Sequence, residues 1–335
     1  MKEYKSFLIC KRFIRFSLLG IYSILNFNSV YSSVDKIRNN DDTLILLETN
    51  KNRAEIENNF IQFNRLRKIS DHVNGLNIFC KCRNWNDSVT LYNALDKINY
   101  FRELAGLDSV NLVSKLNANA MEAAFLMHKN NKLSHYPDQS WKCFNEVRAF
   151  SARRSLLAFY KVGVYNSIEI FFKDNGKENF ECGHRRWLLW GDLKNIGYSK
   201  TSKAEAVFID ISSDSLNKNS NLKFITYPTS GYFPHELIYE RFTFSINSDS
   251  NLVDFSKVEI KANINGKVCR VNNIYTDYTY GDPSIIFEID DLFIIKDNKK
   301  VYNPKFKGEI ISIEIFNLNI NNKINNIKYQ IKPIL

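Results

Sequence analysis

Apolar residues recur at three- and four-residue steps over long stretches of the first two thirds of the chain. Leu91, Leu95 and Ile98 lie on one such stripe, which predicts a helix from Thr90 to Ala105. Asp87 or Ser88 can cap its start, and Gly106 follows its end. Similar patterns predict helices over 113–129, 146–160 and 167–173 and a strand over 206–211.

The pattern changes after about residue 215 to short runs in which apolar and polar residues alternate. These runs predict strands over 242–246, 258–264, 284–289, 310–316 and 327–331. Asn265-Gly266 separates two alternating runs and indicates a hairpin. The chain is therefore expected to be an α+β protein, with a layered helix-and-sheet unit over 88–215 and an antiparallel β-sandwich over 222–335.

The N-terminal segment has the pattern of a secretory signal. Five basic residues precede an apolar run from Phe16 to Phe27, and Val30-Tyr31-Ser32 lies near a plausible cleavage point. We expect residues 1–33 to be a signal peptide, with an uncleaved membrane anchor as the alternative. Residues 34–87 are polar and charge-rich, which predicts a leader, pro-segment or linker.

Composition excludes some classes of function. The formal net charge is +10, but the basic residues are spread along the chain and form no nucleic-acid-binding module. We therefore expect no nucleic-acid partner, and at most some affinity for anionic surfaces.

The cysteines fit an oxidising compartment. Removal of Cys10 with the signal leaves five cysteines, so at least one thiol is free or bonded to another chain. Cys80 and Cys82 are too close in sequence for an easy mutual bridge. Asn86-Asp87-Ser88 is a sequon for N-glycosylation.

Two histidines lie in compact and unusual sequence contexts. His135 ends Leu133-Ser134-His135, directly after a predicted helix, and His184 lies in Gly183-His-Arg-Arg-Trp-Leu-Leu189. Imidazole is a common metal ligand and proton carrier, so two histidines that converge would form a candidate site.

Several segments in the same order resemble the CAP superfamily, which comprises cysteine-rich secretory proteins, antigen 5 and pathogenesis-related 1 proteins. Both histidine segments take part, together with a third segment, Tyr227-Pro-Thr-Ser-Gly-Tyr-Phe-Pro234. The resemblance runs from about residue 88 to the C-terminus. It is strongest to the bacterial and protist branch, in which a sheet domain follows the CAP domain. It implies an α-β-α sandwich over residues 88–215.

The resemblance also implies a cleft lined by two histidines and two acidic residues, which binds a divalent metal in several members. His135 and His184 match the histidines, and they would be the ligands of a zinc ion. One acidic position falls near Arg153-Arg154, where no glutamate is present. Glu169 and Asp174 both remain candidates for the other, so the resemblance implies a weakened metal site.

Plainer roles for the same residues stay open. His184 could hydrogen-bond the floor of the cleft, and His135 could interact with a helix C-terminus. Arg185 and Arg186 could brace the cleft through ion pairs or face solvent. Cys143 and Cys182 flank the two histidine segments, and we expect a disulfide between them.

These features lead to a binding hypothesis. We expect a protein that is secreted or carried to a secretory organelle or the cell surface, where its cleft binds a lipid, a glycan or an extracellular protein. The alternative is a metal-dependent, peptidase-like hydrolase with Glu169 or Asp174 as the base, and a structural surface component is a third hypothesis. Ser134 adjoins His135, but neighbours in sequence seldom have the geometry of a nucleophile and its base.

Overall fold

The structure is a computed structural model that describes residues 35–39, 42–69, 80, 86–160, 167–212, 224–247, 252–297 and 299–334. The expected signal peptide, residues 1–33, lies outside this range. Within the described residues, no helix is long and apolar enough to cross a membrane.

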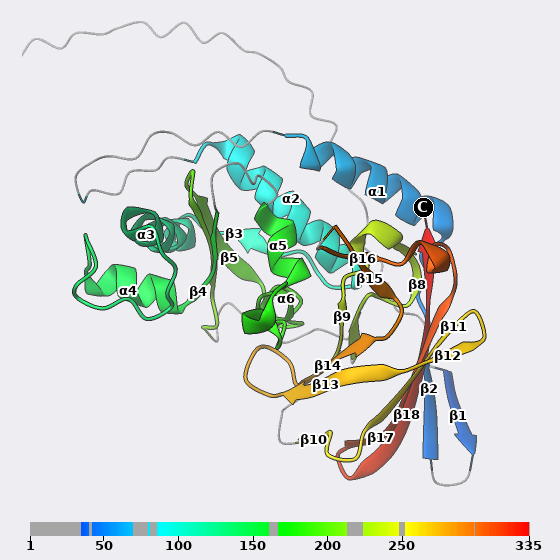
Figure 1. Ribbon diagram of the computed structural model, residues 1–335. Coiled ribbons are helices and arrows are strands. Elements are labelled where there is room, and N and C mark those ends of the chain that lie inside the picture. Colours follow the sequence, from blue (N-terminus) through cyan, green and yellow to red (C-terminus); the bar gives the residue numbers. More distant parts are fainter. Residues whose placement is uncertain are drawn as a thin grey trace, which may run out of the picture.

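The first unit places a four-stranded sheet between two layers of helices, so the expected α-β-α sandwich is present. The sheet has the order β3-β5-β6-β4, and α3 and α4 lie on the side opposite α2 and α5 (Figure 1). Its helices are α2 (Ser88–Leu104), α3 (Ser114–Asn130), α4 (Glu146–Arg153), α5 (Ser167–Lys173), α6 (Gly183–Leu188) and a 3₁₀ turn at Lys177–Asn179. Its strands are β3 (Asn111–Leu112), β4 (Ser155–Phe159), β5 (Asn195–Lys200) and β6 (Ala204–Ile209).

Alternation along the central strands explains these layers. Ala206 and Phe208 of β6 pack in the cluster with α3, whereas Val207 and Ile209 pack in the cluster with α2. A Cβ atom at Gly197 of β5 would lie 2.0 Å from the carbonyl oxygen of Leu116. The sheet and α3 therefore approach so closely that only glycine fits at this position.

The second unit is a β-sandwich, as the alternating runs predicted. One sheet has the order β1-β2-β18-β17-β11-β12, in which β1 is Asp35–Asn39 and β2 is Asp42–Leu47, with β8 and β10 added at β18 and β17. The other has the order β13-β14-β9-β7. Their strands are β7 (Phe224–Tyr227), β8 (Gly231–Pro234), β9 (Arg241–Ile246), β10 (Val253–Asp254), β11 (Glu259–Ile264), β12 (Lys267–Cys269), β13 (Val271–Asp277), β14 (Ser284–Ile289), β17 (Ile311–Ile320) and β18 (Lys323–Ile334). A separate hairpin comprises β15 (Phe293–Lys296) and β16 (Lys299–Tyr302), and 3₁₀ turns lie at His235–Leu237 and Pro304–Phe306.

The smaller sheet of the sandwich is covered on both faces. All six residues of β9 and all six of β14 are buried. The same apolar cluster also contains Phe101 of α2 and Phe172 of α5, whose rings stack 3.9 Å apart between centroids. The two units therefore share one continuous core.

The segment predicted as a polar leader, 34–87, is largely folded into both units, which corrects that expectation. It forms β1 (Asp35–Asn39), β2 (Asp42–Leu47) and α1 (Arg53–Arg67). β2 runs parallel to β18 in the large sheet, and Phe63 of α1 stacks on Tyr100 of α2 at 4.2 Å between ring centroids. The N-terminal segment thus connects the sandwich to the helical unit (Figure 1).

Most expected elements are confirmed, with one clear error at a helix boundary. The Asn265-Gly266 hairpin joins β11 to β12. The helix expected over 146–160 ends at Arg153, and the apolar run that follows forms strand β4 instead. All but one of the residues of β4 are buried, and periodicity cannot distinguish such a run from a buried helix.

The sequon asparagine, Asn86, is enclosed rather than presented to solvent. It is 6% exposed, its Nδ2 donates to the carbonyl of Lys200, and its Oδ1 accepts from Lys200 N and Ser199 Oγ. It therefore holds the start of α2 against β5.

We expect the folded protein to carry no glycan on Asn86, because a glycan would be attached to Nδ2, which is enclosed and donates to Lys200 O. Asn86→Ala should lower the free energy of unfolding by about 1–3 kcal/mol. Ser88→Ala is the matched control, since it removes the sequon but keeps Asn86. Its stability should be unchanged, and glycosidase should change the mass of neither this variant nor the unaltered protein. Intact mass before and after glycosidase treatment checks this, and a glycan-bearing Asn86 in folded protein would contradict it.

Candidate functional site

His184 is positioned by a buried carboxylate. Asp174 follows α5 with a left-handed backbone, φ 49°, and is fully buried. Its Oδ1 lies 2.6 Å from His184 Nδ1, and its Oδ2 accepts a hydrogen bond from the backbone N–H of Arg185. One side chain therefore fixes both the imidazole and the first turn of α6.

His135, in the loop between α3 and α4, is held by a backbone carbonyl of α4. Its Nδ1 lies 3.0 Å from the oxygen of Ala152, in the last turn of α4. Burial lowers the pKa of His135, the hydrogen bond to Ala152 opposes this shift, and the nearby His184 lowers the pKa further. His135 is therefore neutral at neutral pH, and the two imidazoles lie within electrostatic reach of each other.

These contacts place a proton on the same nitrogen of both rings. A carbonyl oxygen and a carboxylate can only accept, so Nδ1 of each imidazole carries the proton. In the described part of the chain, neither Nε2 has a hydrogen-bond partner. We call His135 and His184 the histidine pair.

Glu169 does not join the histidine pair. Arg67 of α1 binds both of its carboxylate oxygens, at 2.8 Å through Nε and at 2.6 Å through Nη2. This bidentate ion pair is largely buried, and Arg67 also reaches Glu236. Glu169 thus fastens α1 to α5 and is not available as a base or as a metal ligand.

The residues around the pair do not fit a zinc centre. Among the described residues, no group of three or more His, Cys, Asp or Glu could hold a metal ion. Both oxygens of Asp174 already accept hydrogen bonds, and Arg153 is exposed where the resemblance expects a glutamate. Protein zinc sites use three or four protein ligands, and the described residues around the pair do not supply that number.

Ser134 is likewise not arranged as a nucleophile. Its Oγ accepts a hydrogen bond at 3.0 Å from the backbone N–H of Tyr136. His135 directs its Nδ1 to Ala152, not to Ser134. Proximity in sequence therefore creates no serine–histidine pair here.

The disulfide differs from the expected one. Cys143 is bonded to Cys80, 63 residues earlier, while Cys182 and Cys269 are free and buried. The expected Cys143–Cys182 bridge is wrong, because Cys182 lies in the core at the N-terminus of α6. Cys82 lies outside the described residues.

The two arginines after His184 connect the helical unit to the sandwich. The buried Arg185 guanidinium donates to the carbonyls of Phe172 and Arg241, both at 2.6 Å. Arg186 forms a buried ion pair with Asp277 and also donates to the carbonyl of Tyr280 at 2.7 Å. Of the two roles left open for these arginines, bracing is therefore the one observed.

Sequence reasoning missed the contribution of the second unit. The loop from Tyr278 to Pro283 joins β13 to β14 and lies beside α6 (Figure 1). It supplies the carbonyl acceptors of Tyr280 and Asp282 to Arg186, and Asp277 at the end of β13 supplies a third. The sequence signals a turn at Gly281-Asp282-Pro283, but a turn signal does not indicate which residue the loop contacts.

This interface should make stability depend on pH. Asp282 is 6% exposed, and burial raises its pKa to about 7. An acid with a higher pKa in the folded protein than in the unfolded chain favours folding at low pH. That contribution is lost as the pH rises through about 7.

We therefore expect Asp282 to cost on the order of 3 kcal/mol of stability between about pH 5 and about pH 8. Asp282→Asn should remove this loss while keeping an acceptor for the N–H of Gly191. Denaturant unfolding of both proteins across this range is the measurement. Equal pH dependence in the two proteins would contradict the assignment.

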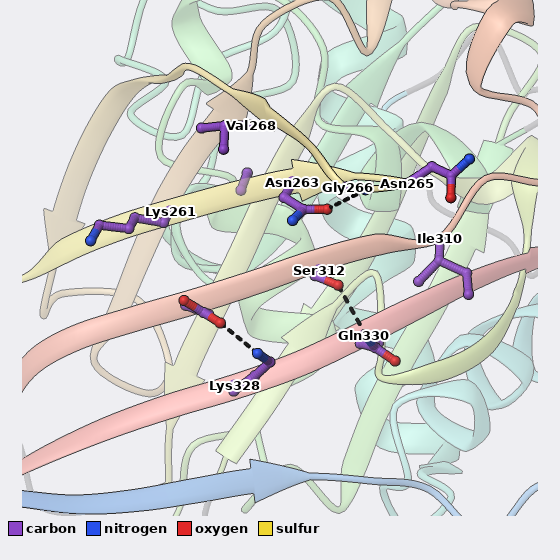
Figure 2. Close-up of a pocket in the computed structure, with 11 residues that line it drawn as sticks. Lys261, Asn263, Asn265, Gly266, Val268, Ile310, Ser312, Lys328 and Gln330 are labelled. Atoms are coloured by element: carbon purple, nitrogen blue, oxygen red, sulfur yellow. Dashed lines mark hydrogen bonds and ion pairs between the residues drawn. The ribbon is translucent and has the colours of Figure 1, made fainter.

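Two described cavities lie in the second unit, and neither is lined by the histidine pair. The larger, about 450 Å³, is an open groove over β11, β17 and β18. Figure 2 shows Lys261, Ser312 and Gln330 along it, with hydrogen bonds from Gln330 to Ser312 and from Lys328 to Glu314. The smaller cavity, about 200 Å³, is lined mainly by acidic and amide residues between β13 and β14.

Comparison with known families matches residues 95–208 to the model of the CAP, or cysteine-rich secretory protein, family. This span runs from α2 to β6 and includes both members of the histidine pair. No curated protein matches the chain.

Proposed function

We propose, from the premise that this chain belongs to the CAP superfamily through residues 95–208, that it is a secreted binding module whose ligand contacts the histidine pair. The observation that supports this proposal is the hydrogen bonding of the two imidazole rings. Each imidazole is fixed through Nδ1, and each has Nε2 without a partner in the described part of the chain. Fixed polar groups of this kind can orient a ligand.

The same geometry argues against the hydrolase alternative. A hydrolase needs an activated nucleophile, a placed base or a metal-bound water. Asp174 orients His184 as a base would be oriented, but Ser134 bonds to backbone and Glu169 is held by Arg67. In the part of the chain that the structure describes, no group of three or more His, Cys, Asp or Glu could hold a metal ion. Binding is thus the function that the contacts support best.

Export is part of the proposal. The signal-like N-terminus favours secretion. The Cys80–Cys143 disulfide fits an oxidising compartment. The β-sandwich would then position the binding unit, since its loop is fastened to α6 by Arg186.

The test combines a binding screen with an activity screen on the full chain. The probes are immobilised neutral oligosaccharides, heparin, phospholipid vesicles and peptide arrays, with casein and ester substrates for hydrolysis. His135→Ala and His184→Ala should each weaken binding at least tenfold. Neither substrate should be hydrolysed.

His235→Ala is the matched control. Its Nδ1 also bonds a carbonyl, that of Ile334 at 3.0 Å, but it lies in the sandwich. This variant should bind like the unaltered protein. Hydrolysis that both His135→Ala and His184→Ala abolish would overturn the proposal, as would binding unaffected by either variant or absent for every probe.

A further inference from the structure

The larger cavity of the sandwich has no part in the proposed function. It is an open groove of about 450 Å³ on one face of the large sheet, and the histidine pair does not line it. Ligand sites in proteins commonly measure about 300–1,000 Å³. Lys261 and Ile310 lie toward opposite ends of the groove (Figure 2). The groove therefore has the size of a ligand site and is built from the sandwich alone.

The strand register arranges the lining side chains in two rows across the sheet. The polar row, whose side chains are uncharged, comprises Asn263, Ser312 and Gln330. The charged row, two residues away on each strand, comprises Lys261, Glu314 and Lys328. Residues two apart on a strand share a face, so the rows are about 7 Å apart, and the strands that they cross are about 4.8 Å apart. Both rows therefore face the groove together.

The charged row contains one cation without a carboxylate partner. Lys328 Nζ pairs with Glu314 Oε1 at 2.6 Å. Lys261 is opposite Glu314 in the register but forms no ion pair with any described residue, and its Nζ lies 4.8 Å from the ring centroid of Phe316. Two lysines and one glutamate line the groove, which leaves one net positive charge. This charge is complementary to a single anionic group on a ligand.

The polar row offers both hydrogen-bond donors and acceptors. Gln330 Nε2 donates to Ser312 Oγ at 3.1 Å, and Asn263 Oδ1 accepts from the N–H of Gly266 at 2.9 Å. Within the described ranges, the Ser312 O–H and Asn263 Nδ2 remain as donors and Gln330 Oε1 remains as an acceptor. A hydroxyl group both donates and accepts, so a ligand with several hydroxyls matches this row.

Apolar side chains flank the polar row. Val268 of β12 is opposite Asn263 in the register and is 78% exposed. Ile310, directly before β17, is 41% exposed, and its carbonyl accepts from the N–H of Asn265. A saccharide ring carries C–H groups beside its hydroxyls, so it can contact both kinds of surface.

Other ligand classes match this groove less well. A peptide cannot add to it as a strand, because β11, β17 and β18 are each paired with a neighbouring strand on both sides. A nucleic acid presents a phosphate at every nucleotide and is bound by several cations, whereas the groove has one unpaired lysine. A ligand with one anionic group and several hydroxyls is the better match.

We infer that the groove is a binding site in its own right, for a saccharide that carries a carboxylate, such as a uronic acid residue of a glycan. The carboxylate pairs with Lys261, the hydroxyls bond to the polar row, and C–H groups contact Val268 and Ile310. This inference does not rest on the proposed function, because the groove contains neither member of the histidine pair. It gives the sandwich a binding role besides positioning the first unit.

The test measures binding to the full chain by isothermal titration calorimetry. The acidic probes are tetragalacturonate and a hyaluronan tetrasaccharide, and chitotetraose is the neutral comparison. At least one acidic probe should bind roughly fivefold or more tightly than chitotetraose. Added salt should weaken that binding, because the charges are exposed to solvent.

Three variants examine the rows separately. Lys261→Gln should weaken binding of the acidic probe about tenfold and remove most of its advantage over chitotetraose. Lys261→Arg keeps the charge and should stay within about threefold of the unaltered protein. Gln330→Ala removes one hydrogen-bonding group of the polar row and should weaken binding roughly fivefold.

Lys323→Gln is the matched control, because Lys323 is exposed on β18 but does not line the groove. It should bind like the unaltered protein, and thermal unfolding should show that every variant is folded. Binding unchanged in both Lys261→Gln and Gln330→Ala overturns the inference, as does failure of both acidic probes to bind. Polyglutamate that binds as tightly as the saccharides would show that charge alone is recognised, which also overturns it.

The histidine variants separate this groove from the histidine pair. His135→Ala and His184→Ala should leave uronate binding unchanged. Uronate binding that is lost in these two variants but kept in Lys261→Gln would overturn this inference and leave the proposed function in place. Uronate binding that is lost only in the groove variants supports the inference, and the proposed function is then decided by its own probes.

Discussion

Arg186→Ala is expected to lower the free energy of unfolding by about 3–5 kcal/mol. The guanidinium is 1% exposed and pairs with Asp277, which is itself 6% exposed. It also donates to the carbonyls of Tyr280 and Asp282. Removing it leaves a buried carboxylate and the carbonyl oxygens of Asp277, Tyr280 and Asp282 without this donor, and buried polar groups without partners cost free energy.

Chemical denaturation with circular dichroism measures this loss. Arg270→Ala is the matched control, since Arg270 precedes β13, the strand that ends in Asp277, and has 81% of its side chain exposed. Its effect should stay within about 0.5 kcal/mol. Arg186→Lys keeps the charge but not the planar fork, so it should be intermediate. If the denaturation midpoint of Arg186→Ala equals that of Arg270→Ala, the ion pair between Arg186 and Asp277 does not contribute to stability and the prediction is wrong.

Cys143→Ser is expected to cost roughly 4 kcal/mol, because the bridge to Cys80 closes a long loop in the unfolded chain. Cys80→Ser and the double variant should lose the same amount, since each removes the same bond. Thermal or denaturant unfolding without reductant measures this. Additive losses in the double variant would contradict the pairing.

Cys182→Ala provides the matched control for this disulfide. The Cys182 thiol is fully buried, and burial raises its pKa to about 11, so it should resist alkylation in the native protein. Its replacement should cost only about 1 kcal/mol through a small cavity. A non-reduced digest that links Cys143 to Cys182 would overturn the assignment.

The sequence predicts elements whose signals are local. The α2 stripe, its Asp87 cap and the Asn265-Gly266 hairpin are all found, because each depends on residues within a few positions of one another. The boundary between α4 and β4 is missed because the run over 155–159 is buried on both faces. Periodicity carries no information in such a run.

The N-terminal segment was misjudged because its partners are distant in sequence. The short apolar patch around Ile45 pairs with β18, almost the full length of the chain away. α1 buries only Ile56, Phe60 and Phe63, so its composition is that of a polar linker. Long-range pairing of this kind has no signature in a single sequence.

The candidate site was only partly predictable for the same reason. His135, His184 and Asp174 were named from sequence because a family resemblance marks them. The carbonyl of Ala152 carries no side-chain signal, and Tyr280 belongs to another unit. Glu169 was a reasonable candidate by position, but Arg67 of the supposed leader holds it.

The most direct test of the account is the protonation pattern of the two imidazoles, read by ¹H–¹⁵N correlation of the histidine-labelled full chain at about pH 7.5. Assignment comes from His135→Gln and His184→Gln. The account predicts that both rings carry a proton on Nδ1, the nitrogen that faces Ala152 O in His135 and Asp174 Oδ1 in His184. A ring whose Nδ1 carries no proton would contradict it.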